Sequence, residues 1–226
     1  MFPDMLAALE SAEHFIFLEY FIIEEGHMFH QIEDILEKKV KEGVEVRLIY
    51  DDVGCIGTLP PRYYKQLQKK GIKCAAFNPF RPLLSVIMNN RDHRKIFVVD
   101  GKVGFTGGIN LADEYINVAS RFGYWKDTGI RLEGEAVWSM TVMKQAIMPQ
   151  VYQKEPFEGD GFVQPYGDTP LDHETVGENI YLNIINHAER YVYIFTPYLI
   201  IDNEMLVSLC NAAKRGLFYS FWYLFI

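Results

Sequence analysis

The sequence predicts an α/β protein with a mixed, largely parallel β-sheet flanked by helices. Two observations lead to this fold class. Short apolar segments rich in aromatic and β-branched residues, typical of buried strands, alternate with amphipathic segments of helical period. The 226 residues are 49% hydrophobic and 23% charged, which is the composition of a globular protein and excludes a disordered or collagen-like chain.

The first third of the chain contains the clearest elements. His14–Ile23 is predicted to be a buried strand, and Met28–Lys41 a helix with one apolar face that stops at Gly43. The flanking elements are, in order, a helix at Met5–Ala12, a strand at Val44–Asp52, a short helix from Pro60 to Gly71 and a strand at Ile72–Phe77. Helices of these lengths between strands predict right-handed crossovers in a parallel sheet.

Two further strands are predicted to flank Asp100-Gly101, a dipeptide that favours the type I′ turn of a hairpin. A strand near Thr128–Leu132 and a helix at Glu135–Met148 complete this unit. The segment Lys154–Gly177 is rich in glycine, proline and acidic residues and has no apolar period, which indicates a linker or long loop.

The opening pattern of the chain then returns. Ala12-Glu13 and the strand after it match Ala188-Glu189 and its following strand, at a separation of 176 residues, which is one domain length. Chance similarity between two common helix–strand–helix patterns is the alternative. The repeat predicts a first domain at 1–153, a linker at 154–176, and the start of a second, incomplete copy at 177–226.

The net charge of −8 conceals one basic block. Ten basic residues and two acidic ones lie between Arg62 and Lys102, which favours a local anion site over a general nucleic-acid surface. Three cysteines without CxxC spacing exclude a disulfide framework and a cysteine-based zinc site, and they suit a reducing compartment. The sequence has no signal-peptide pattern and no run of about 20 apolar residues.

One segment carries residue types suited to phosphoryl chemistry. His93 and Lys95 are two residues apart, so in a strand they point to one face, with an imidazole beside a fixed positive charge. Gly107-Gly108 permits close approach to an anion, and a helix start at Asn110–Tyr115 would offer backbone amides to phosphate. Each element alone is weak, because His-x-Lys is commonly a surface pair and Gly-Gly a turn.

Together these residues form a specific pattern, His93-x-Lys95-x4-Asp100-x6-Gly107-Gly108-x-Asn110. It resembles the HKD signature of the phospholipase D superfamily, HxKx4Dx6G(G/S)xN, at every position. The segments LEYFII, GVEVRLIYDD, NRDHRKIFVVDGKVGFTGGINLADEY, FGYWKDT and FTPYLIIDNEM are similar to bacterial cardiolipin synthases. The resemblance runs from the amino end to about Gly216.

The resemblance implies a phospholipase D-like fold and a phosphatidyltransferase that acts on phosphatidylglycerol, with no metal and no other cofactor. It also implies residue roles. His93 would attack phosphorus and form a phosphohistidine, while Lys95 and Asn110 would hold the non-bridging oxygens, together with the backbone at Gly107 and Gly108.

Three further residues receive expectations from the same resemblance. Asp127, in WKDT, would be the acid that orients the imidazole. Asp100 belongs to the catalytic motif, although its position at the hairpin favours a structural role. Glu114 is a further candidate for the site. His27 and His30 lie near acidic residues but on an apolar helix, so we interpret them as surface residues and not as metal ligands.

The sequence departs from the family in one respect that affects function. The family's site joins two such motifs, one histidine attacking and the other protonating the leaving alcohol, whereas this sequence holds a single His-x-Lys. Three hypotheses follow. The chain is a truncated or split synthase that needs a second HKD half from another chain, or a homodimeric phosphodiesterase or nuclease, or a catalytically inactive remnant.

The substrate class follows from what surrounds the motif. The sequence on either side of the basic block is acidic, and the segments PFRPLLSVIM and LFYSFWYLFI are apolar. Both features favour a phospholipid as the substrate, and no nucleic acid is expected as a partner. We expect a peripheral protein at the cytoplasmic face of the cell membrane, in contact with the membrane surface. The segment LFYSFWYLFI is also expected to promote aggregation or adhesion to lipid.

Overall fold

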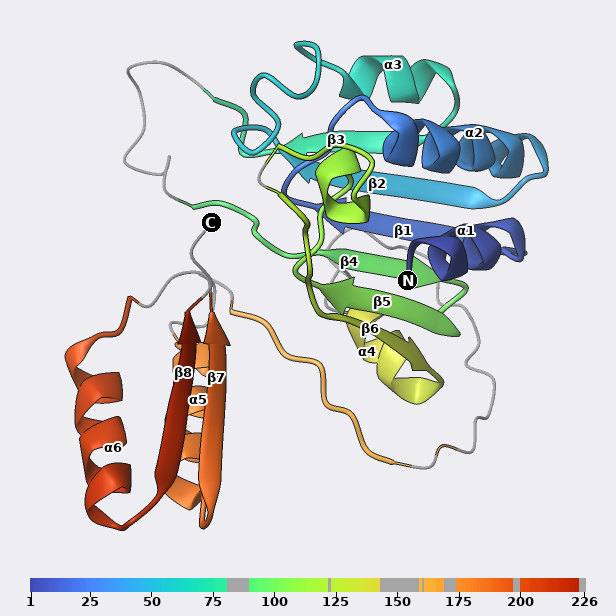
Figure 1. The fold of residues 1–226 in the computed structure, drawn as a ribbon. Coiled ribbons are helices and arrows are strands. Elements are labelled where there is room, and N and C mark those ends of the chain that lie inside the picture. Colours follow the sequence, from blue (N-terminus) through green and yellow to red (C-terminus); the bar gives the residue numbers. More distant parts are fainter. Residues whose placement is uncertain are drawn as a thin grey trace. The chain divides into compact units, whose positions relative to one another are not determined.

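A six-stranded mixed sheet, with the strand order β3-β2-β1-β4-β5-β6, organises the amino-terminal part of the chain (Figure 1). The structure is a computed structural model that describes residues 1–80, 90–121, 123–142, 159, 161–168, 174–196 and 200–223. It divides into two compact units, residues 1–164 and 165–226.

The first unit contains the whole six-stranded sheet. Its elements are, in chain order, α1 (Phe2–Glu10), β1 (Phe15–Tyr20), α2 (His27–Lys41), β2 (Glu45–Asp51), α3 (Tyr64–Lys69), β3 (Lys73–Phe77), β4 (Ile96–Val99), β5 (Val103–Gly107), the 3-10 helix η2 (Asp113–Ile116), β6 (Gly129–Glu133) and α4 (Glu135–Val142). Strands β1, β2 and β3 pair in parallel, whereas β4 pairs antiparallel with β1 and β5, and β5 with β6. The α/β class with a mixed sheet is confirmed, and parallel pairing is confined to the β1–β3 half.

Helices cover both faces of this sheet (Figure 1). On one face α1, α2 and α3 enclose the larger core, which includes Leu18, Ile32 and Phe97. On the other face Val137 and Met140 of α4 pack against β-strand side chains. The central strand β1 is buried at all six positions, and this explains why all its residues except Glu19 are aromatic or aliphatic.

The turn between β4 and β5 forms as the sequence predicts. Asp100 has a φ of 53° and Gly101 a φ of 66°, so both residues occupy the left-handed region that a type I′ turn requires. The N–H of Lys102 donates to the carbonyl oxygen of Val99 at 3.0 Å and closes the turn.

The second unit repeats the element order with which the first unit begins. It contains α5 (Val176–His187), β7 (Tyr191–Thr196), α6 (Asn203–Lys214) and β8 (Phe218–Tyr223), and β7 pairs with β8 in parallel. Its core is small and contains Ile185, Leu209, Ala212 and Leu217. None of the helices within the described ranges has the length and apolar character needed to cross a bilayer.

Three predicted boundaries differ from the structure. The expected helix start at Asn110–Tyr115 is the 3-10 helix η2, which begins at Asp113. His93 and Lys95 precede β4 and do not lie within it, because pairing with β1 begins at Ile96. The linker predicted to extend to Gly177 ends earlier, since α5 starts at Val176.

Parts of several predictions lie outside the described residues. These parts are residues 81–89, which include most of PFRPLLSVIM, residue 122, the predicted helix from 143 to 148, the linker residues 154–158, 160 and 169–173, residues 197–199, and the last three residues of LFYSFWYLFI.

Candidate active site

The motif histidine lies on a short segment that a buried carboxylate holds at the edge of the sheet. Asp51, the last residue of β2, is 0% exposed. Its Oδ2 accepts from the N–H of Asp92 at 3.0 Å, and its Oδ1 accepts from Nη1 of Arg91 at 3.2 Å. Its Oδ1 also accepts from the N–H of Gly54 at 2.9 Å. The backbone segment that leads into His93 is therefore held at the carboxyl end of β2.

His93 and Lys95 lie together at this edge. The Nζ of Lys95 is 3.1 Å from Nδ1 and 3.2 Å from Nε2 of His93, and it donates to the carbonyl oxygen of His93 at 2.7 Å. Lys95 is buried, whereas His93 is exposed and accessible to a substrate. The pair has the composition that attack on a phosphodiester requires, a nucleophile beside a cation.

Phe21, immediately after β1, forms a wall of the same site. Its ring centroid lies 4.6 Å from that of His93, and the Nζ of Lys95 lies 5.4 Å from the Phe21 centroid. These contacts orient the imidazole and add a cation–π interaction with the ammonium group. Sequence reasoning did not single out Phe21, and the available signal was its position at the carboxyl end of a predicted buried strand.

The surroundings lower the pKa of both motif side chains. Desolvation lowers the pKa of His93, and the charge of Lys95 lowers it further, while Asp51 and Asp92 oppose the shift. Burial lowers the pKa of Lys95 to about 8, although Asp127 and Asp92 act in the opposite direction. At neutral pH the imidazole is therefore largely neutral, the form in which its nitrogen is nucleophilic, and the ammonium group keeps most of its charge.

Arg94, between the two motif residues, points away from them into an ionic network. Its Nε donates to Oδ1 of Asp92 at 2.9 Å, and its Nη2 is 3.0 Å from Oε1 of the buried Glu19 on β1. Neighbouring side chains of an extended segment alternate in direction. The network therefore stabilises the arrangement in which His93 and Lys95 share the opposite side.

The glycine pair permits close packing beside the motif. Gly107, the last residue of β5, pairs with Gly129 of β6 and has a φ of 153°. A Cβ on Gly107 would collide with the carbonyl oxygen of Thr128, and one on Gly108 would collide with the carboxylate of Asp127. In this structure the pair thus allows the segment that carries Asp127, just before β6, to approach.

Asn110 is buried and links the loops around the site. Its Oδ1 accepts from the N–H of Ile22 at 3.1 Å, and its Nδ2 donates to the hydroxyl of Tyr115 at 2.8 Å. Ile22 follows Phe21 directly, so Asn110 holds the backbone that positions the aromatic wall against His93.

The charge of Asp127 raises the pKa of Lys95. Its Oδ2 accepts from the indole N–H of Trp125 at 3.0 Å, and its Oδ1 accepts from the N–H of Thr128 at 2.7 Å. Between the two described residues Asp127 and His93 the structure shows no hydrogen bond. Asp127 therefore acts on the motif through its charge on Lys95 and not through a hydrogen bond to the imidazole.

The structure does not bring Asp100 to this site. Asp100 follows the last residue of β4, about 16 Å along the strand from Lys95 at the usual rise per residue. Its carboxylate accepts from the N–H groups of Glu13, His14 and Phe15 at 2.7–2.8 Å. It therefore anchors the hairpin to the start of β1, a structural role.

Two further acidic features are the single residue Glu114 and a cluster of three carboxylates in the second unit. Glu114 lies on η2, where burial and the charge of Glu24 raise the pKa of its carboxyl group. Glu178, Asp202 and Glu204 of the second unit bring carboxylate oxygens together, as a metal site would, but at least two of these residues are solvent-exposed. Such clusters are common on surfaces without an ion, and none of these residues belongs to the motif.

The fold of this chain is similar to that of a solved protein structure. A solved structure of phosphatidylserine synthase from Haemophilus influenzae Rd KW20 is similar with a TM-score of 0.71 and 12% sequence identity, over 97% of this chain and 58% of that chain. The two chains therefore share their overall fold.

The sequence comparisons are more specific. Residues 5–120 match the family described as "Cardiolipin synthase, PLD-like domain", and the chain belongs to this family. It is 37% identical over 229 residues to cardiolipin synthase of Alkalihalophilus pseudofirmus, which covers 96% of this chain and 45% of that protein. It is 53% identical over 226 residues to an uncharacterized protein of Streptococcus mutans serotype c, and the match covers 95% of this chain and 49% of that protein.

The chain spans about half the length of these curated relatives. The predicted resemblance to the phospholipase D superfamily and to bacterial cardiolipin synthases is confirmed.

Proposed function

We propose that this site transfers a phosphatidyl group from phosphatidylglycerol to a second alcohol, such as another phosphatidylglycerol, through a phosphohistidine at His93. The observation that carries the proposal is the exposed imidazole 3.1 Å from the buried ammonium group of Lys95. The relatives named as cardiolipin synthases support the lipid substrate.

In the first step, one imidazole nitrogen of His93 forms a bond to phosphorus, and the bond from phosphorus to the leaving glycerol oxygen breaks. That oxygen takes a proton from an acid on the far side of the phosphate and departs as glycerol. Lys95 exchanges its contact with the imidazole for the non-bridging oxygens, whose charge it stabilises. Asn110 and the backbone at Gly107 and Gly108 border the same oxygens.

In the second step, the hydroxyl oxygen of the acceptor attacks phosphorus and its proton returns to the same acid, while the bond from phosphorus to His93 breaks. The acid is the histidine of a second HKD half, contributed by another domain or by a second copy of the chain. Phe21 and the network around Arg94 hold the nucleophile in place through both steps.

The product is made where both lipids are concentrated, so we place the protein at the cytoplasmic face of the membrane as a peripheral protein. The basic residues exposed on α3 and its preceding loop, Arg62, Lys65 and Lys69, suit contact with anionic headgroups.

The experiment is an assay of the full chain with phosphatidylglycerol in mixed micelles, in EDTA, over a hundredfold range of chain concentration. We expect glycerol and a tetra-acyl product, with activity rising steeply with concentration if a second copy completes the site. His93→Asn is expected to lower the rate at least about 10³-fold, whereas His30→Asn, an exposed histidine on α2, leaves it unchanged.

Two results would contradict the proposal. One is lipid turnover that survives His93→Asn. The other is the degradation of single-stranded DNA in EDTA with no lipid product at any chain concentration, which favours the nuclease alternative.

A further inference from the structure

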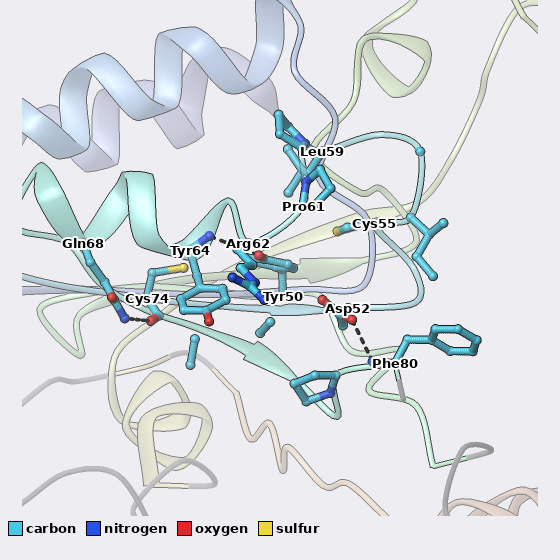
Figure 2. A pocket seen from close by; sticks show the side chains of 16 residues that line it. Tyr50, Asp52, Cys55, Leu59, Pro61, Arg62, Tyr64, Gln68, Cys74 and Phe80 are labelled. Atoms are coloured by element: carbon cyan, nitrogen blue, oxygen red, sulfur yellow. Dashed lines mark hydrogen bonds between the residues drawn. The ribbon is translucent and has the colours of Figure 1, made fainter. Parts of the chain in front are cut away.

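A cavity lies at the carboxyl ends of β2 and β3, and Figure 2 shows the side chains that line it. It has a volume of about 780 Å³ and is enclosed by the ends of β2 and β3, the loop from β2 to α3, and the first turns of α3. Most of its lining is apolar, including Cys55, Leu59, Pro61, Cys74, Ala76 and Phe80.

The polar groups of the lining are few and mostly engaged. The hydroxyl of Tyr50 accepts from the N–H of Tyr64 at 3.1 Å, and the carboxylate of Asp52 accepts from the N–H of Phe80 at 2.8 Å. Burial raises the pKa of the Cys55 thiol to about 12, so it is uncharged at neutral pH. The walls therefore offer little to a polar ligand and suit hydrocarbon.

Arg62 is the exception among the lining residues. Its φ of 62° lies in the left-handed region, which is costly for a residue with a side chain. Within the part of the chain that the structure describes, no carboxylate lies within salt-bridge distance of its guanidinium. The cavity thus combines apolar walls with one cation that has no carboxylate partner among the described residues.

The position of the cavity relates it to the motif. The carboxyl ends of β1, β2 and β3 meet the amino end of β4 at one edge, because β4 is antiparallel to β1. Two to three strand spacings separate His93 from the cavity, about 10–15 Å. Asp51 contacts the N–H of Asp92 beside His93, while Asp52, the next residue, lines the cavity.

We propose that this cavity holds an acyl chain of the phospholipid whose phosphodiester lies at His93 and Lys95, an inference that rests on the proposed function. The separation of 10–15 Å suits a ligand with its phosphate at one end and hydrocarbon at the other. Ile56 and Phe80 line the cavity with 60% and 45% of their surface exposed, so they place apolar groups where a chain enters from a bilayer. Arg62 pairs with a lipid phosphate at that entrance.

The test is photolabelling of the full chain by phosphatidylglycerol that carries a diazirine in one acyl chain, in vesicles of phosphatidylglycerol and phosphatidylcholine. We expect the label on peptides that cover residues 50–64 and 72–80. Ala76→Trp, which fills the cavity, should lower this labelling at least fivefold, and Ile56→Ser, at an exposed position that folding tolerates, should lower it at least twofold. Ile130→Trp, on the exposed edge strand β6, is the matched control and should leave it unchanged.

Repeating the experiment in the His93→Asn protein separates the two proposals, because labelling requires binding of the lipid but not its turnover. Labelled cavity peptides together with lipid turnover that survives His93→Asn would overturn the proposed function and leave the acyl site standing. Turnover with label confined to other peptides, or labelling that neither Ala76→Trp nor Ile56→Ser lowers, would overturn the acyl site. Loss of a dimer in Ala76→Trp without any cavity label would assign the surface to a second copy and would equally overturn it.

Discussion

The strands β1 and β7 follow matching sequence segments and differ in burial. All six residues of β1 are buried, whereas β7 alternates between exposed and half-buried positions. β1 lies between β2 and β4, while β7 pairs only with β8 among the described residues. The same local pattern gives the same strand in both units, and the neighbours decide whether it becomes part of a core.

The largest expected difference is in stability. Leu18→Ala in β1 should lower the free energy of unfolding of the first unit by about 2–5 kcal/mol, because it leaves a cavity in a packed core. Ile194→Ala, at the matching and half-buried position of β7, should cost about 1 kcal/mol or less. Hydrogen exchange of the full chain, read by mass spectrometry for each unit, measures both. Equal losses in the two variants would refute the comparison.

A second contrast concerns two aspartates that anchor backbone N–H groups. Asp100→Asn in the first unit weakens three hydrogen bonds and should cost about 1–3 kcal/mol. Asp202→Asn removes part of the N-cap of α6, where one bond to the N–H of Met205 is made, and should cost less than about 1 kcal/mol. Thermal unfolding of each variant gives the order. Because Asp100 lies away from His93, its variant should keep the pH dependence of turnover, and a changed profile would show a catalytic role.

The pH dependence of turnover tests the electrostatics of the motif. We expect activity to rise as His93 loses its proton, with a midpoint below 6.5, and to fall as Lys95 deprotonates near its pKa of about 8. Asp127→Asn removes a charge that raises the pKa of Lys95, so the alkaline limb should move to lower pH. Glu133→Gln, an exposed carboxylate on β6, is the control. An alkaline limb that does not move in Asp127→Asn would show that the charge of Asp127 does not affect the pKa of Lys95.

The smallest expected effect on stability belongs to the exposed aromatic side chains of the second unit. Tyr193 is 51% exposed and contacts Tyr191 and Phe218, which are also exposed. Tyr193→Ser should change the free energy of unfolding by less than about 0.5 kcal/mol but lower self-association, which light scattering measures. Unchanged scattering would show that this surface does not cause association.

The sequence predicted the elements that depend on short-range pattern. The strand at Phe15–Tyr20, the helix at His27–Lys41 and the Asp100-Gly101 turn follow from period and turn chemistry. The proximity of His93 and Lys95 was also predictable, because two residues of extended chain share a side.

Contacts between distant segments were not predictable in the same way. Asp51 is 41 residues from Asp92, and no local pattern indicates that its carboxylate anchors the motif. From the sequence, Phe21 is one of several aromatic residues in a predicted buried strand. Only the pairing of β1 with β4 places it beside His93. The close approach of Asp127 to Gly108 likewise depends on how the segment before β6 meets the glycine pair.

The most direct measurement of the central claim locates the covalent intermediate. The full chain is mixed with phosphatidylglycerol, quenched at alkaline pH where a phosphorus–nitrogen bond persists, digested and analysed by mass spectrometry. The account predicts a phosphatidyl group on the imidazole of His93, absent from His93→Asn and present in His30→Asn. Product formation by the same protein with no adduct on His93 under any quench time, or with the adduct on another residue, would contradict it.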